Sequence, residues 1–276
     1  MKIIFLLMIS HVMAFYNQCH IMRGTIIMRY NLDSDKFDNN YKYTPKTSNQ
    51  RDYLWRLEDE NINLVLGIGP AGTGKTVFPC QEAVRLLKNK KKIVITRPVQ
   101  SVGEELGYLP GGLNEKMDPW VKPLIDTFEE YYTPLQVETM IKDKKIEIVP
   151  LAFMRGRTFK NSFIIADEMQ NSSPEQMKML LTRIGSGSRM CLTGDLEQCD
   201  SKDSGLKDFI TKLHRYYVLK KNRNMIRDGI ALIQFDKKDV QRHPLISKLI
   251  DIYDNNTIKN CNQSCCNNSV CIDCCN

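Results

Sequence analysis

The sequence predicts an α/β protein in which a mostly parallel sheet is flanked by helices. Between residues 44 and 253, short apolar segments alternate with segments of helical character. Each apolar segment is followed by polar or glycine residues, as expected of parallel strands buried on both faces. A chain of 276 residues with 42% hydrophobic and 26% charged residues is long and apolar enough for one good-sized core.

The apolar segments and the segments between them define the expected elements. Strands are expected at Leu64–Ile68, Ile93–Thr96, Ile146–Pro150, Phe163–Ala166, Met190–Thr193 and Ile230–Phe235. Helices are expected at Gln50–Asp59, Thr76–Lys88, Pro119–Tyr132, Pro174–Arg183, Gly205–Lys212 and Pro244–Tyr253. In such sheets ligands bind beyond the carboxyl ends of the strands, so the loops that follow the strands are the candidate site.

A glycine-rich segment after the first expected strand has the pattern Gly-x-x-x-x-Gly-Lys-Ser/Thr. It consists of Gly69, Pro70, Ala71, Gly72, Thr73, Gly74, Lys75 and Thr76. The amide groups of such a turn, and the positive end of the helix that follows, form an anion site suited to nucleotide phosphates. Lys75 is expected to reach the β- and γ-phosphates, and the Thr76 hydroxyl to hold Mg²⁺. A purely structural glycine turn is the alternative.

Two adjacent carboxylates end the fourth expected strand. Asp167 and Glu168 follow an apolar run that begins at Phe163. We expect Asp167 to hold the Mg²⁺ shell and Glu168 to orient and polarise an attacking water. An acid at the end of a strand can also serve only a helix N-terminus. Together with the phosphate loop, however, the acid pair favours hydrolysis over nucleotide binding alone.

The next strand ends in a second polar segment, residues 193–198. Gln198 in this segment is a candidate to contact the γ-phosphate or the attacking water. Gln170, two residues beyond Glu168, is a candidate to report hydrolysis to a partner surface, as Gln198 would through such a contact. The alternative for the segment is a simple turn made by Gly194 and Asp195.

Residues 1–43 and 255–276 are expected to lie outside the domain, which we place at residues 44–254. An apolar run near Lys2 resembles a secretory signal, but Met22 and Met28 offer later starts, so the first residues are alternatively a spurious extension. We expect a cytoplasmic protein without stable membrane insertion. Six cysteines crowd the final segment, for which disorder, a zinc site or disulfides are the alternatives.

Basic residues cluster in the chain, whose formal net charge is +7. They concentrate at residues 88–92, 142–145, 220–223 and 237–238, and Arg155 and Arg157 flank a glycine. Solvated helix ends and loops are one interpretation of these clusters. Contacts with nucleic-acid phosphates, or with another subunit, are the other.

Several further motifs, taken in order, resemble those of the PhoH family. They are the phosphate loop, Thr96-Arg97-Pro98, residues 103–111, residues 154–159, Asp167–Asn171, Leu192–Gln198 and Asp239–Leu245. The resemblance covers roughly Thr44 to Tyr253. It implies an ATPase with a single RecA-like domain related to superfamily 1 helicases.

The resemblance implies further roles. Gln50 is similar to the glutamine with which helicase-like ATPases read adenine, which makes ATP the expected nucleotide. Arg242 and Arg97 are candidates to stabilise transition-state charge. One RecA-like domain implies that a neighbouring copy completes the site, so a homo-oligomer such as a hexameric ring is expected. The expected partner is RNA or single-stranded nucleic acid. A nucleotide-gated ring assembly protein and a P-loop kinase are the alternatives.

Overall fold

The computed structural model describes residues 41–98, 113–199, 203–219 and 224–241, together with Leu245 and Lys248; for residues 113–120 it describes the backbone only. The chain divides into two compact units, Met1–Tyr41 and Lys42–Asn276. The fold below is that of the second unit. Arg242, residues 103–111, the cysteine-rich segment and most of the expected helix Pro244–Tyr253 lie outside the described residues.

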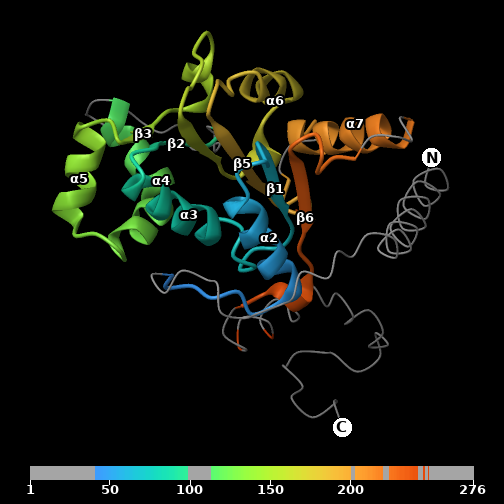
Figure 1. The fold of residues 1–276 in the computed structure, drawn as a ribbon, viewed down its shortest axis with the longest axis horizontal. Helices are drawn as coiled ribbons and strands as arrows, with labels where there is room; N and C mark the ends of the chain where they lie inside the picture. Colours follow the sequence, from blue (N-terminus) through green and yellow to red (C-terminus); the bar gives the residue numbers. More distant parts are fainter. Residues whose placement is uncertain are drawn as a thin grey trace, which may run out of the picture. The chain divides into compact units, whose positions relative to one another are not determined.

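Six parallel strands form one sheet in the order β3-β2-β4-β5-β1-β6 (Figure 1). Their bounds are β1 Leu64–Ile68, β2 Lys92–Thr96, β3 Ile146–Ile148, β4 Ser162–Ala166, β5 Arg189–Gly194 and β6 Ile230–Gln234. In the register, Leu66 of β1 lies beside Leu192 of β5 on one side and Leu232 of β6 on the other. Because all six strands run the same way, every loop that leaves a strand emerges at one edge of the sheet.

The helices cover both faces of this sheet. Their bounds are α2 Ser48–Glu58, α3 Val77–Lys88, α4 Leu113–Glu129, α5 Pro134–Lys142, α6 Pro174–Leu181 and α7 Gly205–Leu219. Helices α2, α3 and α4 pack against one another on one face, while α6 and α7 pair on the other, and α5 lies beside β3 (Figure 1). Within the described residues, no helix is both long and apolar enough to cross a bilayer.

The apolar core follows the alternation of side chains along the strands. Leu64, Leu66 and Ile68 of β1 point to the face covered by α6 and α7, where they join one buried cluster. On the opposite face the ring of Tyr53 from α2 packs edge-on against Phe78 and Phe235, at centroid separations of 6.4 Å and 5.2 Å. Strand β1 is buried along its whole length. The phosphate loop therefore starts from the best-anchored part of the sheet.

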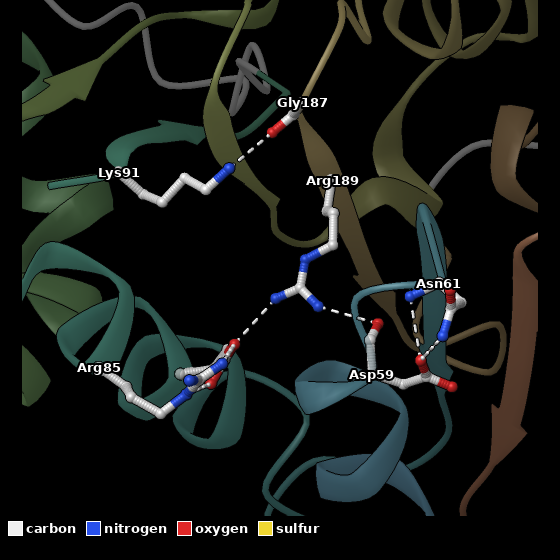
Figure 2. Close-up of polar contacts among 7 residues, drawn as sticks. Asp59, Asn61, Arg85, Lys91, Gly187 and Arg189 are labelled. Atoms are coloured by element: carbon white, nitrogen blue, oxygen red, sulfur yellow. Dashed lines mark hydrogen bonds and ion pairs between the residues drawn. The ribbon is translucent and has the colours of Figure 1, made fainter. Parts of the chain in front are cut away.

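A buried ion network joins α3 to the start of β5. The Glu82 carboxylate, fully buried, accepts from Arg85 at 2.7 Å and from Arg189 at 2.8 Å. Arg189 also donates to the Asp59 carbonyl at 3.0 Å, beyond the end of α2 (Figure 2). One guanidinium thus links α2, α3 and β5 at the edge opposite the carboxyl ends of the strands.

All six predicted strands are present, and the bounds of β1 are those predicted. Strand β3 ends at Ile148, two residues earlier than expected, and α4 starts at Leu113, six residues before the proline taken as its first residue. Helix α5 was not predicted. Only Val137 of α5 is buried, so the sequence lacks a periodic apolar face there. The available signal was its capping box, in which Thr133 and Gln136 bond reciprocally around an N-terminal proline.

Candidate nucleotide site

The phosphate loop, residues 69–76, connects β1 to α3. Gly69 has φ +147° and Gly74 has φ +91°, conformations that side-chain-bearing residues rarely adopt. A Cβ at Gly69 would lie 2.6 Å from the Phe235 carbonyl oxygen, and one at Gly74 would lie 2.6 Å from the Phe78 ring. Both glycines are therefore required by the backbone path as well as by close approach of neighbouring groups.

The amides of this loop fit a phosphate ligand. Within the described part of the chain, the backbone N–H groups of Ala71, Gly72, Thr73 and Gly74 donate no hydrogen bond. Helix α3 follows directly at Val77, with its positive end at the loop. A concave run of unpaired amides at a helix N-terminus is the arrangement that binds phosphate oxygens.

Lys75 lies over the loop, and 8% of its surface is exposed. Its Nζ donates to the Pro70 carbonyl at 2.7 Å, so the side chain folds back across the turn rather than extending into solvent. The Thr73 hydroxyl bonds to the same carbonyl at 3.0 Å. The ammonium group of the predicted lysine therefore lies against the turn itself.

Thr76 and Asp167 meet although β5 separates their strands in the sheet. The Thr76 hydroxyl donates to Oδ1 of Asp167 at 2.9 Å, and the Thr193 hydroxyl of β5 bonds to the same oxygen. The other carboxylate oxygen, Oδ2, accepts no hydrogen bond and is paired with the Arg97 guanidinium at 3.0 Å. Arg97 also lies 3.5 Å from Glu168.

These groups fit Mg²⁺. The ion prefers oxygen ligands and is commonly bound by one or two carboxylates together with substrate phosphates, keeping several waters. Asp167 is almost fully buried, with one oxygen lacking a hydrogen bond, and the Thr76 hydroxyl lies beside it. Among the described residues, no cluster of three or more His, Cys, Asp or Glu side chains offers a metal cage. The pair is therefore suited to a cation that arrives with phosphates.

Glu168 differs from its neighbour in exposure and conformation. Its side chain is 41% exposed, and its backbone is left-handed at φ +55°, an uncommon state for glutamate. Gln170 donates to its Oε2 at 2.6 Å. Gln170 is itself buried, and its Oε1 accepts the amide of Asp195 at 3.1 Å. Gln170 thus connects the acid pair of β4 with the loop that follows β5.

Gln198 is exposed in the structure, and no hydrogen bond joins its side chain to another described residue. It lies in the same loop as Asp195, but the contact with the acid pair is made by Gln170. Arg242, the other predicted catalytic residue remote from the motif, is outside the described residues.

Gln50 is buried, and all four hydrogen-bonding positions of its amide are used by the protein. Its Oε1 accepts from the amides of Lys46 at 2.8 Å and Thr47 at 3.3 Å, which caps α2. Its Nε2 donates to the carbonyls of Thr73 and Asp239, both at 3.1 Å. An adenine contact would compete with these bonds, so adenine reading stays a prediction.

Tyr53, one turn after Gln50, is a site residue that the sequence did not reveal. Its hydroxyl donates to the Lys75 carbonyl at 3.0 Å and lies 3.1 Å from the Cys191 sulfur. Burial raises the pKa of Tyr53 well above its usual value and that of Cys191 to about 12, so both groups stay protonated. No sequence motif predicts such a tyrosine. A Cβ at Gly67 would lie 2.7 Å from the Tyr53 ring, so a glycine at this position leaves room for the tyrosine.

The parallel sheet, the glycine loop between β1 and α3, and the acid pair at the end of β4 define an α/β domain of the P-loop class. Within that class the family is also clear. The family model described as PhoH-like protein matches residues 42–254, and the chain belongs to this family.

Relatives in several bacteria support the assignment. The chain is 46% identical over 211 residues to the PhoH-like protein of Bacillus subtilis (strain 168), covering 76% of this chain and 63% of the relative. It is 40% identical over 214 residues to the PhoH-like protein of Synechocystis sp., covering 76% and 61%. The chain thus spans about three fifths of the length of these relatives.

Among solved structures, the chain resembles the crystal structure of Pif1 helicase from Candida albicans. The TM-score is 0.33 at 15% identity, over 76% of this chain and 44% of that chain. A likeness at this level carries no information about function.

Proposed function

We propose that this protein binds ATP with Mg²⁺ and hydrolyses it, and that it couples hydrolysis to binding or unwinding RNA or single-stranded nucleic acid. The observation that carries the proposal is the meeting of Thr76 and Asp167, 2.9 Å apart, beneath a loop of unpaired amides. Two hard oxygen ligands beside a phosphate cradle suit a metal-bound triphosphate.

The described residues would have the following roles in binding and hydrolysis. The amides of Ala71 to Gly74 and the Lys75 ammonium bind phosphate oxygens and stabilise charge that develops on them. Thr76 and Asp167 hold Mg²⁺, which supplies charge neutralisation between the phosphates when bound. Glu168, exposed beside the buried Asp167, accepts a hydrogen bond from a water and orients it. Arg97 balances the two acids.

The nucleic-acid partner, the homo-oligomer and the cytoplasmic location belong to the proposal. Membership of the PhoH-like family is the support for this part of the proposal. Among the described residues, Gln198 is exposed in the loop that follows β5, where another molecule can reach it. A neighbouring copy that brings Arg242 to this loop would complete a ring such as a hexamer.

Release of free phosphate from Mg-ATP, with no acceptor added, tests the reaction. We expect Lys75→Ala to abolish nucleotide binding or turnover. We expect Glu168→Gln to bind Mg-ATP normally and to hydrolyse it about 10²- to 10⁴-fold more slowly, as for loss of a general base. Glu175→Gln, on the first turn of α6, is the matched control and should behave as the parent does. Hydrolysis by Glu168→Gln at the parent rate would contradict the assignment.

Adding single-stranded RNA tests the coupling. Turnover that rises with RNA supports nucleic-acid work. Turnover indifferent to RNA, in a particle that assembles only with nucleotide, would indicate a nucleotide-gated assembly protein. Phosphate transfer that requires an added acceptor would indicate a kinase.

A further inference from the structure

A group of lysines lies at the amino-terminal ends of three neighbouring strands. Strands β3, β2 and β4 are adjacent and parallel, so the loops that enter them share the edge opposite the phosphate loop. We call the lysines of these loops, together with the last residue of α3, the basic edge: Lys88, Lys90, Lys91, Lys144, Lys145 and Lys160. All six are exposed except Lys91, which is partly buried.

Hydrogen bonds hold these loops together as one surface. The Ile93 amide donates to the Lys145 carbonyl at 2.8 Å, and the Lys92 amide donates to the Asn161 carbonyl at 3.3 Å. The Lys91 ammonium donates to the Gly187 carbonyl at 3.0 Å, which ties the surface to the turn before β5 (Figure 2). The lysines therefore project from fixed positions on a rigid edge.

Two of the lysines occupy strained backbone positions. Lys90 and Lys144 both have φ +58° and follow the C-terminal caps of α3 and α5, where glycine is the usual residue. A left-handed conformation is unfavourable for residues other than glycine, because the Cβ atom crowds the backbone. Interaction of the ammonium with the negative end of each helix offsets only part of that cost. The sequence retains a positive charge at both positions although glycine would fit the backbone better.

The charges of the basic edge are mostly unpaired. Among the described residues only Lys145 has an ion-pair partner there, Asp143 at 3.3 Å. By contrast, the nearby guanidinium groups of Arg85 and Arg189 form ion pairs with buried Glu82. Unpaired cations gathered on one surface repel one another, and a polyanion relieves that repulsion.

We propose that the basic edge binds the phosphate backbone of single-stranded nucleic acid. A lipid surface fits less well, because none of the large exposed apolar side chains of the described residues lies within residues 88–91, 143–145 or 155–161. The inference rests on the nucleic-acid partner in the proposed function and gives it a location. Strand β2 has five residues, so the two edges of the sheet lie about 16 Å apart along the strand, and both ligands can bind together.

The variant Lys90→Gly/Lys144→Gly removes two charges while relieving the backbone strain, so it should fold as well as the parent. Lys207→Gln/Lys212→Gln on α7 removes the same charge elsewhere and is the matched control. The probe is a fluorescein-labelled 20-nucleotide oligouridylate, with anisotropy measured at several salt concentrations. Each phosphate contact on a single strand contributes about 0.7 to the slope of log K against log salt. We expect the slope of the glycine variant to fall by about 1.4, affinity at low salt to fall on the order of tenfold, and the control to match the parent.

Parent-like affinity and slope in the glycine variant, or an equal loss in the control, would overturn the inference. So would lysine-dependent binding to phosphatidylserine vesicles by a parent that does not bind the RNA. Phosphate release from Mg-ATP without RNA separates this inference from the proposed function. If the parent hydrolyses ATP and binds RNA, and the glycine variant binds RNA equally well, only the assignment of RNA binding to the basic edge is wrong. A parent that releases no phosphate contradicts the proposed function instead.

Discussion

Gln50 of α2 donates its side-chain amide to the carbonyl of Thr73, 3.1 Å away in the phosphate loop. One turn later, Tyr53 donates to the Lys75 carbonyl at 3.0 Å. A third loop carbonyl, that of Gly72, accepts the Gln241 amide at 2.8 Å. The loop is thus held from its carbonyl side by α2 and by the segment after β6, which leaves its amides turned toward a ligand.

Replacing Gln50 by glutamate should weaken binding of both ATP and GTP. The change keeps the shape of the side chain but removes both donors, so the carbonyls of Thr73 and Asp239 lose their partner. An unsatisfied buried carbonyl costs about 1–3 kcal/mol, and thermal melting should show it. Calorimetry with Mg-ATP and Mg-GTP measures the affinities. Gln136→Glu, at the same capping position of α5, is the control. Selective loss of ATP binding would instead identify Gln50 as the adenine reader.

The Tyr53→Phe variant should lose about 1 kcal/mol of stability and bind Mg-ATP more weakly, because the Lys75 carbonyl loses its donor. The ring that fills the space beside Gly67 is retained. Denaturant unfolding and nucleotide titration measure the two effects. Tyr217→Phe removes a hydroxyl bonded to Asp228 at 2.8 Å on the surface and should leave nucleotide binding unchanged. Equal nucleotide affinities in both variants would contradict a role for Tyr53 in holding the loop.

Gln170→Met should slow turnover about 10- to 100-fold with little change in KM for ATP. The methionine fills a similar volume but removes the bond that positions Glu168, and small displacements of a catalytic group have large effects on rate. Steady-state phosphate release separates kcat from KM. A rise in KM with unchanged kcat would show that Gln170 serves binding rather than the orientation of Glu168.

Glu82→Ala should destabilise the fold by about 3 kcal/mol without touching the nucleotide site. Removing the carboxylate leaves Arg189, only 12% exposed, without its ion-pair partner. Glu138→Ala removes one member of an exposed pair with Lys142 and should destabilise the fold much less. Urea unfolding of both variants gives the comparison. Similar midpoints for the two would contradict a structural role for the buried network.

The sequence predicted the sheet well because each strand is a short apolar run closed by polar residues, and β1 and β4 are buried along their whole length. Helix α5 was not predicted because it contributes a single buried residue, Val137. A helix stabilised by its caps and by contact at the edge of a sheet has no apolar periodicity to detect.

The candidate site was predictable where its residues are local in sequence or follow strands of the same parallel sheet. The glycine loop is local, and Asp167 follows β4, so parallel topology brings both to the same edge of the sheet. The partners of Gln50 and the position of Tyr53 depend on how α2 packs on β1 and β6, which no local pattern encodes. The pairing of Arg97 with Asp167 likewise requires β2 beside β4.

Strand β6 and the segment that follows it come late in the sequence, yet β6 pairs directly with β1 and Gln241 bonds to Gly72. During synthesis the glycine loop leaves the ribosome long before these partners exist. Contacts that join distant parts of a chain form slowly, since closing a long loop has an entropic cost. The loop is therefore completed only after β6 and residue 241 have been translated, and a nascent chain halted before β6 should have an unfinished loop.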